Sequence, residues 1–166
     1  MIPGRSAVRP VLPLAFAVSA AIACRPADGP DRLDQPVDLR ASAAALYDSY
    51  TTSLTEGRPE ALSSFYHPDG AIRVINGFTR RATRAGLDSS YRSGWNPPAF
   101  FAWDSLVFDS IAPGNVIVTG TFRWVEQGKR DTTHWLYAAL LQVIDSGLAI
   151  RFEHETRTEG AVSSKQ

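Results

Sequence analysis

The sequence contains very little cysteine, histidine or lysine, and no excess of either charge. Its 166 residues include one cysteine, Cys24, and three histidines, His67, His134 and His154, and its formal net charge is zero. A single cysteine cannot form an internal disulfide, and the histidines lack the spacing of a metal site. A balanced charge gives no long-range attraction to nucleic acid. We therefore expect no disulfide, no metal and no nucleic-acid partner.

No long apolar run and no glycine-rich phosphate loop is present, and no serine lies in a nucleophile elbow, so we expect no cofactor. The longest mostly apolar stretch, residues 11–23, is thirteen residues long, whereas a transmembrane helix needs about 20. It follows Arg5 and Arg9 and ends in small residues, the three-part pattern of a secretory signal peptide. We expect cleavage rather than a retained membrane span.

The end of this segment reads Ala21-Ile22-Ala23-Cys24. It resembles the lipobox of bacterial lipoproteins, in which the cysteine is lipidated, although leucine is usual where Ala21 stands. The resemblance implies a signal peptide at 1–23, lipidation of Cys24, and a chain held outside the cytoplasm in the cell envelope by its lipid anchor. The alternative is an ordinary signal peptide and a soluble secreted or periplasmic protein. Three prolines within 24–36 favour a flexible tether there.

The rest of the chain predicts one domain, residues 37–158, followed by a disordered tail at 159–166. Apolar spacing and turn residues predict helices at 41–54, 59–66 and 79–93, a strand at 71–75, and a β-meander at 100–111, 116–126, 132–144 and 148–158. A single α+β domain is the expected class.

Two segments carry a family resemblance. They read EGRPEALSSFYHPDGAI at 56–72, between the first and the third predicted helix, and LLQVIDSGLAIRFEHETR at 140–157, at the end of the meander. With the order of elements, they resemble the SnoaL-like branch of the nuclear transport factor 2-like superfamily, which also includes the ketosteroid isomerases. The resemblance implies a cone-shaped α+β fold, with three N-terminal helices packed on a strongly curved, mostly antiparallel sheet around a pocket.

Strand alternation predicts which side chains face that pocket. With Ser146 and Gly147 as a two-residue hairpin turn, Leu141 pairs with Phe152 and Ala139 pairs with His154. The pocket face then collects Trp135, Tyr137, Leu141, Val143, Leu148, Ile150, Phe152 and His154. The outer face collects His134, Gln142, Arg151, Glu153, Glu155 and Arg157. A slip of one residue would reverse these assignments.

His154 beside Tyr137 is a candidate general acid/base pair, because an imidazole titrates near neutral pH and a phenol can donate to a developing oxyanion. Asp104 could orient His154 in one register and is exposed in the other. The alternative is a structural His154 in the core. Residues 71–76 contain no carboxylate, whereas the resemblance places the catalytic aspartate of ketosteroid isomerases in this strand, so steroid isomerisation is not expected.

The leading hypothesis is a module that binds a small apolar or aromatic molecule. Its expected pocket residues are Tyr47, Tyr50, Trp95, Phe122, Trp124, Trp135, Tyr137, Phe152 and His154. One alternative is a lyase, isomerase or hydrolase that uses His154, and another is a module for a protein partner. A homodimer through the outer sheet face is a further expectation.

Overall fold

The computed structural model describes residues 38–158, which form one α+β domain. Cys24, the predicted signal peptide and tether, and the predicted tail at 159–166 lie outside the described residues. Within the described range, no helix combines the length and the apolar character needed to cross a membrane. The predicted fold class, helices packed on a curved and mostly antiparallel sheet, is confirmed.

The first helix, α1, runs over Leu39–Thr55. Asp38 caps it, because its carboxylate accepts hydrogen bonds from the backbone N–H groups of Arg40 and Ala41. Residues spaced three and four apart place Ala43, Tyr47, Tyr50 and Leu54 on one buried face. A short second helix, α2, covers Pro59–Leu62 and continues as a 3₁₀ turn, η2, over Ser63–Phe65.

Six strands form one sheet in the order β2-β1-β6-β5-β4-β3. Their bounds are β1 Ala71–Ile75, β2 Phe78–Ala82, β3 Phe100–Ala112, β4 Asn115–Val125, β5 Thr132–Ile144 and β6 Gly147–Thr158. The β1–β6 pair is parallel and every other pair is antiparallel. The predicted meander is therefore correct to within one residue at each strand end.

The predicted third helix at 79–93 is wrong in its first part. Phe78–Ala82 is strand β2, which pairs with β1, and the helix α3 covers only Arg84–Gly94. Asn76 and Gly77 turn the chain with positive φ angles of 48° and 82°, as expected for an Asn-Gly hairpin turn. Thr83 then caps α3 by accepting from the N–H of Gly86.

A β-bulge in β6 reverses the predicted faces of its second half. Leu141 pairs with Ile150, whereas Leu140 pairs with Phe152, so Arg151 is an extra residue in the strand. Beyond it, alternation continues in the opposite phase. The predicted pairs of Leu141 with Phe152 and of Ala139 with His154 are wrong, and Phe152 and His154 leave the pocket face.

The reversal brings acidic and basic side chains to the inner face instead. Glu153, Glu155 and Arg157, expected on the outer face, all lie on the inner side of β6, and Glu153 is completely buried. The turn itself is also displaced, because Ile144 pairs with Gly147 and the turn residues are Asp145 and Ser146. The turn begins one residue earlier than predicted, which shifts the pairing of β5 with β6 by two residues. A shift of two residues leaves each side chain on the same face of the sheet.

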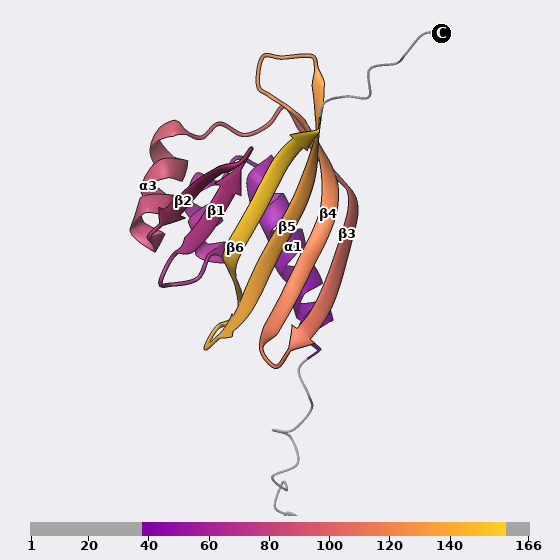
Figure 1. The fold of residues 1–166 in the computed structure, drawn as a ribbon. Helices are drawn as coiled ribbons and strands as arrows, with labels where there is room; N and C mark the ends of the chain where they lie inside the picture. Colours follow the sequence, from indigo (N-terminus) through magenta and orange to yellow (C-terminus); the bar gives the residue numbers. More distant parts are fainter. Residues whose placement is uncertain (1–37, 159–166) are drawn as a thin grey trace, which may run out of the picture. The chain divides into compact units, whose positions relative to one another are not determined.

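The helix α1 lies against one face of the part of the sheet formed by β3 to β6, while α3 lies beside β1 and β2 (Figure 1). Gly120 of β4 permits a bulge in the neighbouring strand. A Cβ atom at Gly120 would lie 2.3 Å from the carbonyl oxygen of Ser105, next to the irregularity between Trp103 and Ser105. The close approach therefore requires glycine.

Candidate functional site

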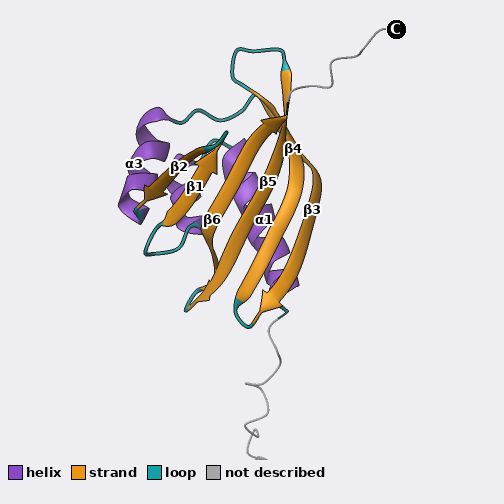
Figure 2. Cartoon of the chain, in the orientation of Figure 1, coloured by secondary structure: helices purple, strands orange, loops and turns teal. Residues whose placement is uncertain are grey.

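A cavity of about 870 Å³ opens between the inner face of the sheet, α1 and α3. Its lining includes residues of two loops, 95–99 after α3 and 126–131 between β4 and β5. Figure 2 shows both loops near the same end of the sheet. Its volume is within the range of about 300–1,000 Å³ found for small-molecule sites. The lining includes the aromatic residues Tyr50, Tyr91, Trp95, Phe101, Trp103, Phe122, Trp124, Trp135 and Tyr137.

Aromatic side chains of three neighbouring strands form one wall of the cavity, which we call the aromatic wall: Phe101 and Trp103 on β3, Phe122 and Trp124 on β4, and Trp135 and Tyr137 on β5. Phe122 of β4 stacks on Trp135 of β5, with ring centroids 5.8 Å apart and an angle of 2° between the planes. Trp103 of β3 meets Phe122 and Tyr137 edge to face at 5.3 and 5.2 Å. Such pairs fix ring orientation beyond what burial alone would do. The wall is therefore a packed surface, present before any ligand binds.

Tyr47 lies behind this wall rather than in it. Its hydroxyl forms a 2.7 Å hydrogen bond with the hydroxyl of Tyr137. Tyr47 is 1% exposed and does not line the cavity. Burial, together with the charges of Glu153 and Glu155, raises the pKa of Tyr47 well above its ordinary value. Tyr47 thus positions the Tyr137 ring as a neutral phenol.

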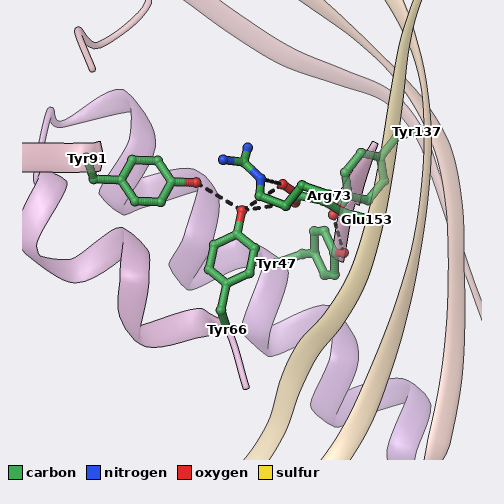
Figure 3. A network of polar contacts seen from close by, with 6 residues as sticks. All are labelled: Tyr47, Tyr66, Arg73, Tyr91, Tyr137 and Glu153. Atoms are coloured by element: carbon green, nitrogen blue, oxygen red, sulfur yellow. Dashed lines mark hydrogen bonds and ion pairs between the residues drawn. The ribbon is translucent and has the colours of Figure 1, made fainter. Parts of the chain in front are cut away.

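A polar network adjoins the cavity, which two of its members, Arg73 and Tyr91, line; the network is shown in Figure 3. Glu153 on β6 accepts hydrogen bonds from the Tyr66 hydroxyl at 2.9 Å to each oxygen, and from Nε of Arg73 on β1. The Tyr66 hydroxyl also lies 2.9 Å from that of Tyr91 on α3. The completely buried carboxylate is therefore paired with a cation and hydrogen-bonded, as a buried charge requires.

The guanidinium of Arg73 is held by aromatic rings as well as by Glu153. Its central carbon lies 5.7 Å from the ring centroid of Tyr66 and 5.9 Å from that of Tyr91, within cation–π range. Burial is the largest single influence and opposes its charge, but the Glu153 carboxylate, together with Tyr66, Tyr91 and Glu155, outweighs burial and raises the pKa of Arg73 above its ordinary value. Arg73 is a fixed positive charge in the cavity wall.

Glu155 is the group whose charge state can change near neutral pH. It lies on the inner face of β6 opposite Tyr137 and lines the cavity. Burial, and after it the charge of Glu153, raises the pKa of the Glu155 carboxyl to about 8, while Arg73 acts in the opposite direction. At pH 7 this side chain is therefore mostly a neutral carboxylic acid that can donate a hydrogen bond.

Six of the expected pocket residues line the cavity: Tyr50, Trp95, Phe122, Trp124, Trp135 and Tyr137. His154 does not, because Glu153 and Glu155 face inward and alternation turns the residue between them to the opposite face. Its Nε2 lies 3.1 Å from Oγ1 of Thr156. Phe152 also points away from the cavity. The predicted positions of these two residues in the pocket are wrong.

Asp104 is separated from the cavity too. It is the extra residue of the bulge in β3 and forms an ion pair with Arg123 at 2.7 Å on the outer side of the sheet. Asp104, His154 and Tyr137 are therefore not brought together, and no acid/base group of the predicted catalytic set reaches Tyr137.

Arg73, Glu153 and Glu155 were not predicted as site residues from the sequence. Arg73 has a visible signal, because it interrupts the apolar strand Ala71-Ile72-Arg73-Val74-Ile75, and an arginine in a buried strand needs a partner. Glu153 and Glu155 were assigned to the outer face, because the bulge at Arg151 reverses the alternation of β6 beyond it. No cluster of three or more metal-ligating side chains occurs within residues 38–158. The site combines a broad aromatic wall with the Arg73 guanidinium and the titrating Glu155 carboxyl.

No protein-family model matches the sequence. No curated protein matches it either. Solved structures do match the fold, at low sequence identity. An NTF2-like protein of unknown function from Shewanella oneidensis has a TM-score of 0.61 at 14% identity, covering 70% of this chain and 97% of its own.

Two further structures give the same result. An NTF2-like protein from Cytophaga hutchinsonii has a TM-score of 0.59 at 14% identity, over 72% of this chain and 98% of its own. A scytalone dehydratase-like protein from Novosphingobium aromaticivorans has a TM-score of 0.55 at 11% identity, over 72% and 83%. The described domain therefore has the nuclear transport factor 2-like fold.

Proposed function

We propose that this domain binds a small molecule with a flat aromatic or apolar body in the cavity between its sheet and helices. The observation that carries the proposal is the aromatic wall around a cavity of about 870 Å³. Flat apolar ligands gain most from such a surface, because ring contacts add to the burial of apolar area. An enzyme using His154 has less support, since His154 does not line the cavity.

The test is binding of 2-naphthol, a neutral bicyclic probe, measured by calorimetry and by tryptophan fluorescence. Trp124→Ala removes a lining ring that is only partly buried, and we expect it to weaken binding at least about fivefold, which is about 1 kcal/mol. Phe100→Ala is the matched control, because Phe100 is a 44% exposed aromatic residue that does not line the cavity. Equal affinity of Trp124→Ala and the unchanged protein would contradict the proposal.

We also propose that the domain is exported and held at a membrane by lipid on Cys24. The support comes from the signal-like segment and the sequence of residues 21–24. Expression in a bacterial host with radiolabelled palmitate tests it: the chain should carry label and partition with membranes. Cys24→Ser should abolish both. An unlabelled chain in the soluble periplasmic fraction would support the ordinary signal peptide instead.

A further inference from the structure

The two terminal nitrogens of Arg73 carry no hydrogen bond within residues 38–158, because only its Nε contacts Glu153. In Figure 3 they point away from the carboxylate. The Tyr50 hydroxyl likewise has no hydrogen-bond partner in the described part of the chain. No unpartnered side-chain polar atom in this part is fully buried. These donors are therefore accessible to solvent, and both residues line the cavity.

The unused donors lie near one another in the cavity lining, and each can donate a hydrogen bond to a ligand. Arg73 presents two N–H₂ groups and a fixed positive charge, Tyr50 presents a hydroxyl, and Glu155 presents a carboxyl. A guanidinium with both terminal nitrogens free has the fork geometry that matches a carboxylate. A ligand group that lies here must accept hydrogen bonds from several donors at once.

We propose that the part of the cavity lined by Arg73, Tyr50 and Glu155 is a subsite for the carboxylate of a small aromatic carboxylic acid, bound by the terminal nitrogens of Arg73 with Tyr50 and Glu155 as further donors. The inference deepens the proposed function and rests on it. The aromatic wall binds the ring system of the ligand, and Arg73, Tyr50 and Glu155 select a carboxylate as its head group.

A cationic head group fits this subsite less well than a carboxylate does. The Glu153 carboxylate is completely buried and is already occupied by Tyr66 and Arg73. Glu155 is held mostly in its neutral form at pH 7 by burial and by Glu153, which raise its pKa to about 8. The remaining full charge that faces the cavity there is the guanidinium. Lys129 and Arg157, which also line the cavity, are balanced in number by Glu126 and Asp131, so these four residues favour neither sign of charge.

A neutral acceptor is the closer competitor, and the ordering of the network favours the anion over it. Arg73 is held by Glu153 and by the rings of Tyr66 and Tyr91, so little side-chain entropy is lost when a ligand binds. A carboxylate brings its own negative charge and two oxygens that can accept from both terminal nitrogens of Arg73, whereas an amide brings no charge and a single acceptor oxygen. The carboxylate therefore gains more than an amide of the same shape.

The test compares three probes that share one ring system: 2-naphthoate, neutral 2-naphthamide and cationic 2-naphthylmethylammonium. Their dissociation constants with the purified full-length chain are measured by calorimetry at pH 6.5. We expect 2-naphthoate to bind at least about tenfold more tightly than 2-naphthamide, and the cation to bind most weakly. Equal or tighter binding of the amide or the cation would overturn the subsite while leaving the aromatic site standing. Failure of all three probes to bind would overturn both proposals.

Arg73→Lys tests the subsite further, because it keeps a positive charge near Glu153 but removes the fork of donors. We expect it to weaken 2-naphthoate binding at least about tenfold and to change 2-naphthamide binding less than about threefold. Arg123→Lys is the matched control, since Arg123 pairs with Asp104 on the outer side of the sheet. Equal losses for both probes in Arg73→Lys would assign Arg73 a structural role and overturn its part in the subsite.

The unchanged protein provides a test that needs no variant. The titratable and charged groups around Glu155 are Glu153 and Arg157 on its own strand, Arg73 on β1, Tyr137 on β5, Tyr91 on α3, and Tyr47 and Tyr50 on α1. A bound carboxylate favours the protonated form of Glu155, so 2-naphthoate binding should weaken as pH rises above about 8. Glu155→Gln should remove this dependence. A pH-independent affinity in the unchanged protein would overturn the role of Glu155.

Discussion

The side chains of Arg73 and Glu153 form an ion pair between two parallel strands, β1 and β6, and the Glu153 carboxylate in it is completely buried. Arg73 and Glu153 also occupy paired positions in the register of these strands. The pair thus links the parallel strands β1 and β6 beside the cavity, which Arg73 lines.

Removing one partner of this pair should destabilise the domain strongly. Arg73→Met leaves the Glu153 carboxylate buried with only the hydroxyl of Tyr66 to satisfy it, and we expect a loss of about 3–5 kcal/mol in the free energy of unfolding. The double variant Arg73→Met/Glu153→Gln removes the uncompensated charge and should regain at least half of the loss. Urea unfolding of the single and double variants measures both effects. Additive losses in the double variant would show that the two groups are not coupled.

The elements with an unbroken periodicity could be predicted from the sequence. The alternation of Phe122 and Trp124 on β4, and of Trp135 and Tyr137 on β5, continues without a bulge, so their common face was correctly identified. In β6 the extra residue Arg151 interrupts the alternation. Because nothing in the local sequence marks it, the acidic half of the site was assigned to the wrong face.

Strand β2 was missed for a different reason. Thr79, Arg80 and Arg81 are exposed on an edge strand, so they show no apolar alternation, and they run directly into the capped helix α3. The Asn76-Gly77 pair is a strong hairpin signal that could have identified the strand. The burial pattern of an edge strand depends on the rest of the sheet, which the sequence does not display.

The stability of the domain should fall as pH rises because of Glu155. Its pKa is raised from 4.5 to about 8 in the folded state, so between these values the folded state binds one proton that the unfolded state does not. The free energy of unfolding therefore decreases with pH in this window, by at most about 1.4 kcal/mol per pH unit. Below pH 4.5 the full contribution of this proton is present, and above about pH 8 it is lost.

Glu155→Gln should flatten this part of the pH profile, because the amide does not titrate. Chemical unfolding between about pH 5 and 9 measures the difference between the two proteins, so the titration of other groups cancels. Parallel profiles for the unchanged protein and the variant would mean that Glu155 is ionised throughout the range.

The hydroxyl pair of Tyr47 and Tyr137 predicts a second non-additive result. Tyr47→Phe or Tyr137→Phe alone leaves one buried hydroxyl without its 2.7 Å partner and should cost about 1–2 kcal/mol. The double variant removes both hydroxyls and should cost less than the sum of the single variants. Thermal unfolding of the four proteins completes the cycle. A double variant that loses the full sum would show that the two hydroxyls act independently.

The outer face of the sheet carries exposed apolar side chains as well as His134 and Gln142, which remain on the face expected from the sequence. Val107, Ile117 and Leu136 are 50%, 36% and 50% exposed on the consecutive strands β3, β4 and β5. We propose that a second copy of the chain packs here, and expect Leu136→Glu to convert a dimer into a monomer in light scattering. Phe78→Glu is the control, because Phe78 is 82% exposed on the far edge strand β2. A monomeric unchanged protein would contradict the proposal.

His154→Ala should leave the binding of 2-naphthol unchanged to within about twofold. Because His154 alternates with Glu153 and Glu155, which both face inward, its ring lies on the opposite side of β6 and bonds Thr156 instead. The substitution removes only this contact, and calorimetry with 2-naphthol measures the effect. Trp124→Ala serves as the positive control, since Trp124 lines the cavity. If His154→Ala weakened binding as much as Trp124→Ala, the ligand would have to lie on the outer face of the sheet, and the cavity would not be the binding site.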